Sequence, residues 1–343
     1  MSSPIISVII PAYNAAHSVA VCLESLVNQK DSTEIIVIDD GSTDATAKIC
    51  KDFASVFSGV LKVISIPNSG VSIARNVGLK ASCGKYIFFA DADDLLEPDA
   101  FHDLAIAADR DNSDWVCADF YSRYDDSKRF LCSLNLPSPC IKGKDSILSL
   151  IRNYLDTPRG VSLFTNVWGK LYRRQLIQNH KIFFSPDMKT WEDTLFNCQY
   201  AAVADIVSYV KKPVYNYNVN CGVSSGGTSI LEQPFGHRQI INALLEILRG
   251  RGENETFLKS LQSRAEGYFA VKNLLSTAKL VKEEKVELKD LYQLAEQYCS
   301  DGQCIRELRK YRSRKGESFW VPFFLKLNMP RTAVKCCMNK MSR

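Results

Sequence analysis

Four short apolar runs near the start of the chain, each followed by polar residues, constrain the fold most strongly. The runs cover residues 5–11, 34–40, 61–66 and 86–90. Stretches with helical spacing of apolar residues lie between and after them, over residues 16–29, 43–57 and 71–82. Strands that alternate with helices of about 10 to 15 residues form βαβ units with parallel strands. We therefore expect an α/β fold with a mostly parallel sheet flanked by helices.

Polar loops at the ends of these runs are candidates for a binding site. In open α/β sheets the ligand binds beyond the carboxyl ends of the strands, so the loops should meet at one edge. Turn formation alone would also favour several of these residue types. In chain order, the loops supply Pro11, Tyr13 and Asn14, then Asp39 and Asp40, then Asn68, and finally Asp91, Asp93 and Asp94. The joint presence of acids, an aromatic ring and amides favours a site.

The acidic cluster Asp91-Ala-Asp93-Asp94 allows two interpretations. Carboxylates this close repel one another unless a cation lies between them. A hard divalent metal prefers oxygen ligands, and Mg²⁺ commonly uses one or two carboxylates together with substrate phosphates. The alternative is an acidic turn that caps the next helix. We expect Asp94 to take the second role, capping a helix over residues 95–109.

Two familiar nucleotide-binding patterns are missing from the sequence. The first apolar run is not followed by G-x-G-x-x-G, and G-x-x-x-x-G-K-[ST] occurs nowhere. If a nucleotide binds, metal and side chains must hold its phosphates in place of a glycine-rich loop. This inference favours the metal interpretation of Asp91 and Asp93.

Length and composition indicate an ordinary globular protein. The 343 residues suggest about two domains, and no apolar run approaches the length of a spanning helix, about 18 residues. The N-terminus lacks the features of a signal peptide, so we expect a cytoplasmic protein. The twelve cysteines have no C-x-x-C spacing and are interpreted as free, buried thiols. The four histidines are isolated and are interpreted as structural or solvated.

Four of these sequence motifs resemble those of the family 2 glycosyltransferases. The similarity rests on Ser-Val-Ile-Ile-Pro-Ala-Tyr-Asn14, Val-Ile-Asp39-Asp40-Gly-Ser-Thr-Asp44, Ala-Arg75-Asn76-Xaa-Gly78 and Phe-Ala-Asp91-Ala-Asp93-Asp94, in the family order over residues 5–120. The resemblance implies the GT-A fold, a nucleotide-binding sheet related to the Rossmann fold. It also implies an inverting enzyme that uses a nucleotide-diphosphate sugar and a divalent metal, Mn²⁺ or Mg²⁺.

The resemblance also implies roles for residues of the first half. Pro11, Tyr13, Asn14 and Asn68 would contribute to the donor site, with Asp39 accepting a hydrogen bond from the base, typically uracil. Arg75 would lie beside the base or the phosphates, and Asp91 would hold the ribose or a metal-bound water. Asp93 would be the direct metal ligand. A structural ion pair of Arg75 on its own helix and core packing for Tyr13 remain alternatives.

The second half resembles the acceptor side of bacterial members that make surface polysaccharides. The matching segments are Val167-Trp168-Gly-Lys170, Thr190-Trp191-Glu192-Asp193 and Pro213-Val-Tyr215 through Ser224-Ser225. The resemblance implies that Asp193 is the catalytic base and that Glu192 supports acceptor or base. Trp168, Lys170 and Ser224 would lie on the acceptor and phosphate side. Asn218 and Asn220 replace a basic residue found in many members, and an acid pair at a helix start is the alternative for Glu192 and Asp193.

Beyond residue 230, helical spacing predicts an extension with a basic end. Residues 306–343 hold eleven Lys and Arg against Glu307 and Glu317, a local charge of +9 within a chain of net charge +5. Next to these bases lie Phe319-Trp320-Val-Pro-Phe323-Phe324, a combination suited to an anionic membrane surface. The alternatives are a solvated helix with an aromatic plug that packs on the catalytic domain, and nucleic-acid binding, which lacks a recognised module.

Together these inferences predict three regions: a nucleotide-sugar half over residues 1–120, an acceptor half over 121–229 and a helical extension over 230–343. The expected protein is a metal-dependent glycosyltransferase peripherally bound to the inner face of the cell membrane. It would move a sugar from a UDP-sugar to a saccharide acceptor, lipid-linked and destined for a surface polysaccharide. The rival functions are a non-catalytic nucleotide-sugar-binding module, and a phosphatase or nucleotidyltransferase with a strand-end Asp-x-Asp.

Overall fold

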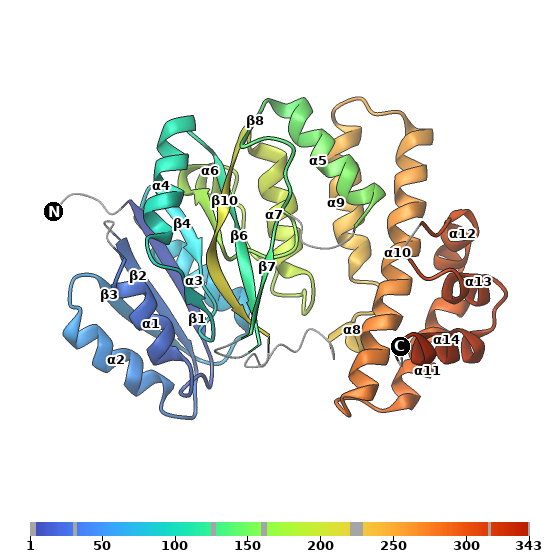
Figure 1. The fold of residues 1–343 in the computed structure, drawn as a ribbon, viewed down its shortest axis with the longest axis horizontal. Coiled ribbons are helices and arrows are strands. Elements are labelled where there is room, and N and C mark those ends of the chain that lie inside the picture. Colours follow the sequence, from blue (N-terminus) through green and yellow to red (C-terminus); the bar gives the residue numbers. More distant parts are fainter. Residues whose placement is uncertain are drawn as a thin grey trace. The chain divides into compact units, whose positions relative to one another are not determined.

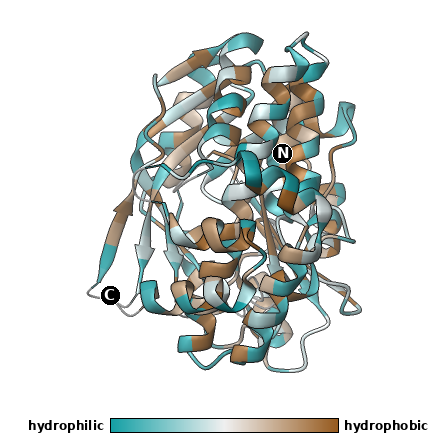
Figure 2. Ribbon diagram, turned by 90° about the vertical axis from the view of Figure 1, so that its right-hand side faces the viewer, coloured by the Kyte–Doolittle hydropathy of each residue, from teal (hydrophilic) through white to brown (hydrophobic). Residues whose placement is uncertain are grey.

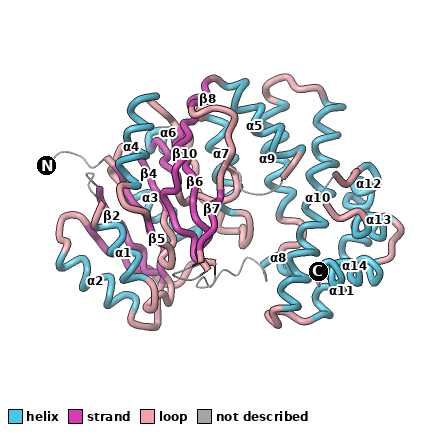
Figure 3. The backbone as a smooth tube through the Cα atoms, in the orientation of Figure 1, coloured by secondary structure: helices cyan, strands magenta, loops and turns pink. Residues whose placement is uncertain are grey.

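The computed structural model describes residues 5–29, 33–124, 128–158, 163–219, 229–314 and 317–341. The chain forms two compact units (Figure 1). Unit 1 consists of residues 1–147, 161–187 and 192–223, and unit 2 of residues 148–160, 188–191 and 224–343. Unit 1 contains the sheet, and unit 2 contains the C-terminal helices, as the colouring in Figure 3 shows.

Within the described residues, unit 1 is built on a ten-stranded sheet with the order β3-β2-β1-β4-β9-β6-β10-β5. In addition, β7 pairs with β6, and β8 pairs with β10. The strands are β1 (Ile6–Ala12), β2 (Thr33–Asp40), β3 (Leu61–Ile66), β4 (Tyr86–Phe89), β5 (Leu95–Leu96), β6 (Trp115–Arg123), β7 (Arg129–Cys132), β8 (Cys140–Lys142), β9 (Lys170–Arg173) and β10 (Ile206–Asn218).

The half formed by β3, β2, β1 and β4 is parallel throughout, as the alternation in the sequence predicts. Its central strands are apolar and buried on both faces, which is typical of a parallel sheet covered by helices. The connecting helices are α1 (Val19–Val27), α2 (Thr46–Val56) and α3 (Val71–Ala81). Helix α2 starts later than predicted: its N-cap is Ala45, and the preceding residue, Asp44, accepts a hydrogen bond from Thr46 N at 2.9 Å through Oδ1.

The other half of the sheet is mixed. Strands β6 and β10 are parallel, whereas β5, β7, β8 and β9 pair antiparallel with their neighbours. These four strands are short, and the sequence did not predict them. The helices in this part of the chain are α4 (Ala100–Asp111), α5 (Lys144–Asp156), α6 (Arg174–Asn179) and α7 (Glu192–Val203).

A glycine allows α3 to lie directly on the sheet. A Cβ atom at Gly78 would come within 2.3 Å of Ile9 Cγ2 on β1, closer than any real contact. Ile9 is fully buried and belongs to a central strand, so it has no free space to move into. The glycine therefore fixes the height of α3 above the sheet, and with it the position of Arg75 one turn earlier.

Unit 2 is helical. Its helices include α8 (Ser229–Glu232), α9 (His237–Arg249), α10 (Glu255–Lys282), α11 (Leu288–Ser300), α12 (Gly302–Lys310), α13 (Trp320–Lys326) and α14 (Pro330–Met341). The predicted helical spacing is confirmed, and the aromatic segment forms most of α13. An apolar core joins the inward faces of α8 and of α10 to α14, including Leu274, Leu291, Leu308, Val321 and Val334. Figure 2 shows hydrophobic and hydrophilic residues on these ribbons.

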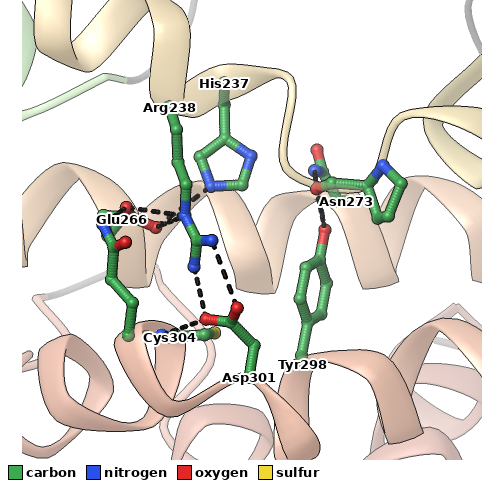
Figure 4. Close-up of polar contacts among 9 residues, drawn as sticks. His237, Arg238, Glu266, Asn273, Tyr298, Asp301 and Cys304 are labelled. Atoms are coloured by element: carbon green, nitrogen blue, oxygen red, sulfur yellow. Dashed lines mark hydrogen bonds and ion pairs between the residues drawn. The ribbon is translucent and has the colours of Figure 1, made fainter.

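A polar network lies inside unit 2 (Figure 4). The buried carboxylate of Glu266 accepts a hydrogen bond from Arg238 Nε at 3.0 Å and lies 3.3 Å from His237 Nε2. Arg238 Nη2 donates to Asp301 Oδ1 at 2.6 Å, and Asp301 also caps α12 through Cys304 N. The network thus joins the starts of α9 and α12 to the middle of α10.

None of the described helices combines the length and apolar character that crossing a bilayer requires. The described cysteines are all free, and most are buried as predicted, but Cys83 is exposed and Cys132, Cys140 and Cys336 are partly exposed.

Candidate functional site

The loops that follow β1, β2 and β3 are tied together by side-chain hydrogen bonds. Asn14, at a positive φ of 48°, accepts a hydrogen bond from Thr43 N at 2.8 Å through its Oδ1. The carboxylate of Asp40 accepts hydrogen bonds from Ser69 N and Gly70 N, both at 2.8 Å. The prediction that these loops share one edge of the sheet is therefore confirmed.

The predicted donor residues in these loops differ in exposure. Asp39 is buried and accepts a hydrogen bond from Ser42 N at 3.2 Å. The side chain of Tyr13 is 44% exposed, so it is available for a ligand instead of being packed in the core. Pro11 is partly exposed near the end of β1, and Asn68 is exposed in the loop after β3. The donor roles of these residues stay predictions.

Arg75 is the centre of a charged cluster made from distant parts of unit 1. Its Nη1 donates to Asp193 Oδ1 at 2.6 Å, and its Nη2 donates to Asp91 Oδ1 at 3.0 Å. Glu192 Oε1 lies 3.6 Å from Nη1. The guanidinium also stacks at 5.2 Å over the ring of Phe184. The structure thus brings together Arg75 on α3, Asp91 after β4, and the two acids that begin α7.

One buried arginine faces three carboxylates in this cluster, and the pKa values of the two acids on α7 are raised. Burial raises the pKa of Glu192 to about 7, with the charge of Asp193 adding to the rise and Arg75 opposing it. Burial also raises the pKa of Asp193, against the effect of Arg75. Asp193 Oδ2 accepts a hydrogen bond from Val167 N at 3.3 Å. The pKa near neutrality belongs to Glu192, and a carboxyl group with such a pKa is suited to proton transfer.

The ion-pair partners of Arg75 lie outside its own helix, on the loop after β4 and on α7. Its contact with the base or the phosphates stays a prediction. Phe184 is held in place by Asn76, whose amide donates to Phe184 O at 2.8 Å and accepts from Phe184 N at 2.9 Å. Arg75 and Asn76 are adjacent on α3, so the same turn of the helix supplies the guanidinium and fixes Phe184, the ring on which the guanidinium stacks.

Asp94 does not cap a helix, so that expectation is wrong. Helix α4 begins at Ala100 and is preceded by Asp99, well after Asp94. Asp94 is buried, and its Oδ1 accepts a hydrogen bond from Asn218 N at 2.7 Å. Asn218 Nδ2 in turn donates to Asp93 O at 2.8 Å. Asp94 and Asn218 thus attach the end of β10 to the acidic loop.

Asp91 and Asp93 have the chemistry for a hard divalent cation. Burial and the charge of Asp91 raise the pKa of Asp93, so a cation beside it would relieve an unfavourable environment. No group of three or more potential metal ligands exists within the described residues. Mg²⁺ is commonly bound by one or two carboxylates, with substrate phosphates and water as the remaining ligands. The residues therefore fit such a metal in the presence of a diphosphate.

Lys170 and Trp168 are buried, which corrects their expected contacts with acceptor and phosphate. Lys170 is 2% exposed, its Nζ donates to Asn166 O, and burial lowers its pKa to about 7. Trp168 stacks on Tyr215, with ring centroids 4.7 Å apart, and on Tyr217. Both residues therefore support the site from inside. Ser224 and Ser225 lie outside the described residues.

One contributor was missed in the sequence. Tyr215 OH accepts a hydrogen bond from Asp91 N at 2.9 Å, which fixes the start of the acidic loop. No local pattern signals this role, because the two residues lie 124 positions apart in the sequence. His17 is exposed, in keeping with its interpretation as a solvated side chain.

The fold and the site define an α/β protein of the GT-A type with a helical C-terminal region. The model of the family described as Glycosyl transferase family 2 matches residues 7–183. The chain belongs to this family.

Curated relatives carry related names. The chain is 31% identical over 253 residues to the cholesterol galactosyltransferase of Borreliella burgdorferi, covering 72% of this chain and 68% of that protein. It is 32% identical over 219 residues to the glycosyltransferase GlyA of Streptococcus pneumoniae, covering 63% of this chain and 31% of GlyA. The chain spans 62% of the length of two further relatives, EpsH and EpsJ of Bacillus subtilis.

Among solved structures, residues 1–349 of Staphylococcus aureus TarS, in a complex with UDP-GlcNAc, share this fold. The TM-score is 0.67, with 19% identity, and the alignment covers 98% of this chain and 91% of that one. At this identity, the likeness shows the fold alone.

Proposed function

We propose that the protein is an inverting glycosyltransferase that moves a sugar from a UDP-sugar to a hydroxyl of a saccharide acceptor. The observation that carries this proposal is the cluster in which Arg75 joins Asp91, from the donor motifs, to Asp193, the candidate base. TarS, which has this fold, was solved with UDP and with UDP-GlcNAc. We therefore propose a sugar linked to uridine diphosphate as the donor.

In the proposed reaction, Asp193 takes the proton of the acceptor hydroxyl as its oxygen attacks the anomeric carbon. The new carbon–oxygen bond forms while the bond to the diphosphate oxygen breaks, and the electron pair leaves with UDP. A single displacement inverts the configuration at the anomeric carbon. Arg75 holds Asp193 in a fixed direction, which keeps base and donor aligned.

Asp93 and Asp91 are the residues that would hold Mn²⁺ or Mg²⁺. Bound there, the metal would neutralise charge on the leaving diphosphate. Asp39 and Tyr13 are proposed to hold the nucleoside, since both lie at the shared edge of the sheet. Support for the nucleoside site comes from the hydrogen bonds that fix the loops around it.

The proposed acceptor is a lipid-linked saccharide in the synthesis of a surface polysaccharide, and the proposed location is the cytoplasmic face of the membrane. TarS carries the name of a poly(ribitol-phosphate) β-N-acetylglucosaminyltransferase, and GgaA of Bacillus subtilis is named a minor teichoic acid biosynthesis protein. Both names concern surface polymers, which supports this substrate class.

The deciding experiment incubates the protein with Mn²⁺ and a panel of UDP-, GDP- and dTDP-sugars and measures the slow hydrolysis of each donor. We expect release of UDP from one UDP-sugar. Release of free phosphate or pyrophosphate instead would favour a phosphatase or nucleotidyltransferase. Tight binding of a UDP-sugar without turnover, even with saccharide acceptors present, would identify a non-catalytic binding module.

A further inference from the structure

Helix α13 of unit 2 exposes a group of large apolar side chains. Phe319 and Trp320 are 60% and 57% exposed, and Phe323 is also exposed. Leu327 and Met329, in the turn that follows the helix, are exposed as well. Single exposed apolar residues are common on protein surfaces, but a contiguous group of this size marks an interaction surface.

The opposite face of α13 explains why these rings point outward. Val321 and Leu325 are fully buried in the helical core, together with Ala333 and Val334 of α14. The exposed positions 319, 320 and 323 fall on the other side of the helix, because residues three and four apart share a face. Folding the core therefore leaves the aromatic face uncovered.

The exposed rings form an ordered cluster. The ring centroids of Phe319 and Trp320 lie 5.2 Å apart, and those of Trp320 and Phe323 lie 5.8 Å apart, both in edge-to-face contact. Such contacts stabilise the rings in one arrangement before any partner binds. The cluster can therefore enter an apolar environment with little further loss of side-chain freedom.

Uncompensated positive charge lies on the next helix. Arg331 and Lys335 are exposed on α14 at a spacing of four, which places them on one face, and Lys340 is exposed near its end. Among the described residues, none of these three bases has an acid within ion-pair distance. The acids of this part of the chain have other partners: Glu317 pairs with Arg264, and Glu307 pairs with Lys310.

We propose that these exposed residues form a membrane-binding surface for an anionic bilayer, which we name the α13 surface. It consists of Phe319, Trp320, Phe323, Leu327, Met329, Arg331, Lys335 and Lys340. The rings lie at the depth of the headgroups, where aromatic side chains are favoured, and the bases attract acidic lipids. Because the bases of two copies would repel each other, the same surface is less suited to self-association.

The α13 surface goes beyond the transfer reaction and identifies the part of the chain that would hold it at a lipid-linked acceptor. Its test does not depend on catalysis. Binding to vesicles is measured by flotation, using the full chain and vesicles of phosphatidylcholine alone or mixed equally with phosphatidylglycerol. We expect the protein to bind the mixed vesicles and to bind vesicles of phosphatidylcholine alone much more weakly. Binding to the mixed vesicles should fall as the salt concentration rises.

Two pairs of variants separate the contributions. W320S/F323S should abolish binding, whereas F257S/L288S, which changes exposed apolar residues on α10 and α11, should leave it intact. R331Q/K335Q should lower the partition coefficient about thirty-fold, since each basic residue near such a surface contributes about five-fold. K48Q/K51Q, with the same change of charge on exposed lysines of α2, should leave it unchanged.

Thermal unfolding and hydrolysis of the UDP-sugar in solution provide the controls, and both should be unaltered in all four variants. Vesicle binding that survives W320S/F323S, or that is equal for neutral and anionic vesicles, would overturn the proposal. Two other results, each without vesicle binding, would also overturn it. One is a dimer that the W320S/F323S substitutions dissociate, and the other is tight binding of single-stranded RNA. Vesicle binding by a protein that hydrolyses no donor would uphold the α13 surface and remove the transferase proposal.

Discussion

Arg75 Nη1 lies 2.6 Å from Asp193 Oδ1 and joins side chains 118 positions apart in the sequence. The same guanidinium contacts Asp91, so one buried cation links the end of β4 to the start of α7. Removing one partner from a buried charge pair leaves an uncompensated charge, which is costly. Variants that test this cluster should therefore carry a side chain of the same shape, such as Asn for Asp or Gln for Glu.

The first prediction concerns Asp193. D193N keeps the shape and a hydrogen-bond acceptor for Arg75 but cannot take a proton, so transfer should fall about 100- to 10,000-fold. Binding of UDP, measured by calorimetry, should stay unchanged. Turnover equal to that of the unaltered protein would remove Asp193 from the mechanism.

The second prediction concerns the pH dependence of the same step. Burial raises the pKa of Glu192 to about 7, and the charge of Asp193 adds to the rise. Glu192 is therefore largely protonated below neutral pH and gains its charge beside Asp193 as the pH rises through about 7. Gln stays neutral, so in E192Q the change of kcat/KM with pH that follows this ionisation should disappear from the profile near pH 7, with activity retained. Loss of activity at every pH would make Glu192 the base.

The third prediction concerns the metal. D93A removes the proposed ligand, so the gain in UDP affinity that Mn²⁺ provides should disappear while weak metal-free binding persists. Calorimetric titrations with and without Mn²⁺ measure the difference. D52A, which removes an exposed acid from α2, is the matched control and should keep the full metal effect. Undiminished metal dependence in D93A would refute the assignment.

The fourth prediction compares two helical glycines in unit 2. A Cβ atom at Gly267 would lie 2.5 Å from the ring of the buried Tyr311, whose hydroxyl donates to Glu317 at 2.7 Å. G267A should therefore lower the free energy of unfolding by about 1 to 3 kcal/mol. At Gly302 the nearest atom is the end of the Arg306 side chain, at 3.5 Å, so G302A should be neutral or gain up to ~1 kcal/mol. Urea unfolding of both variants provides the measurement.

The fifth prediction concerns stability in acid. Burial by itself raises the pKa of Glu34, but hydrogen bonds from Ser7, Cys83 and Lys62 outweigh it and lower the pKa from 4.5 to about 2. The stability that Glu34 contributes is therefore present above its unfolded pKa and is lost as the pH falls through the folded value. E34Q should be less stable than the unaltered protein at pH 7, with a difference that shrinks toward pH 2. Parallel urea unfolding curves at every pH would contradict this.

Much of the parallel half of the sheet could be predicted because its signals are local. The apolar runs gave β1 to β4 to within about one residue, and the spacing between them gave α1 to α3. The start of α1 moved from residue 16 to Val19 because a turn forms first, in which Ser18 N and Val19 N both donate to Ala15 O. Such capping geometry is only partly encoded in residue type.

The antiparallel strands and the interior of the site could not be predicted in the same way. Strand β5 has two residues and β9 has four, too few for a periodic signal, and their pairing depends on distant segments. Lysine side chains are usually exposed, yet the fold buries Lys170 in β9. The bridge made by Arg75 has no local pattern, because its partners are set by how α3 and α7 reach the same edge of the sheet.

The bridge also has a consequence for the order in which the site forms during synthesis. When the ribosome has made residues 1–120, Arg75 and the acids after β4 exist, but the acids that begin α7 have not been added. Arg75 can then pair only with Asp91 from the cluster described above. The nascent chain therefore carries half of a charge cluster, which becomes complete only after residue 193 has left the exit tunnel and α7 has folded onto the rest of unit 1.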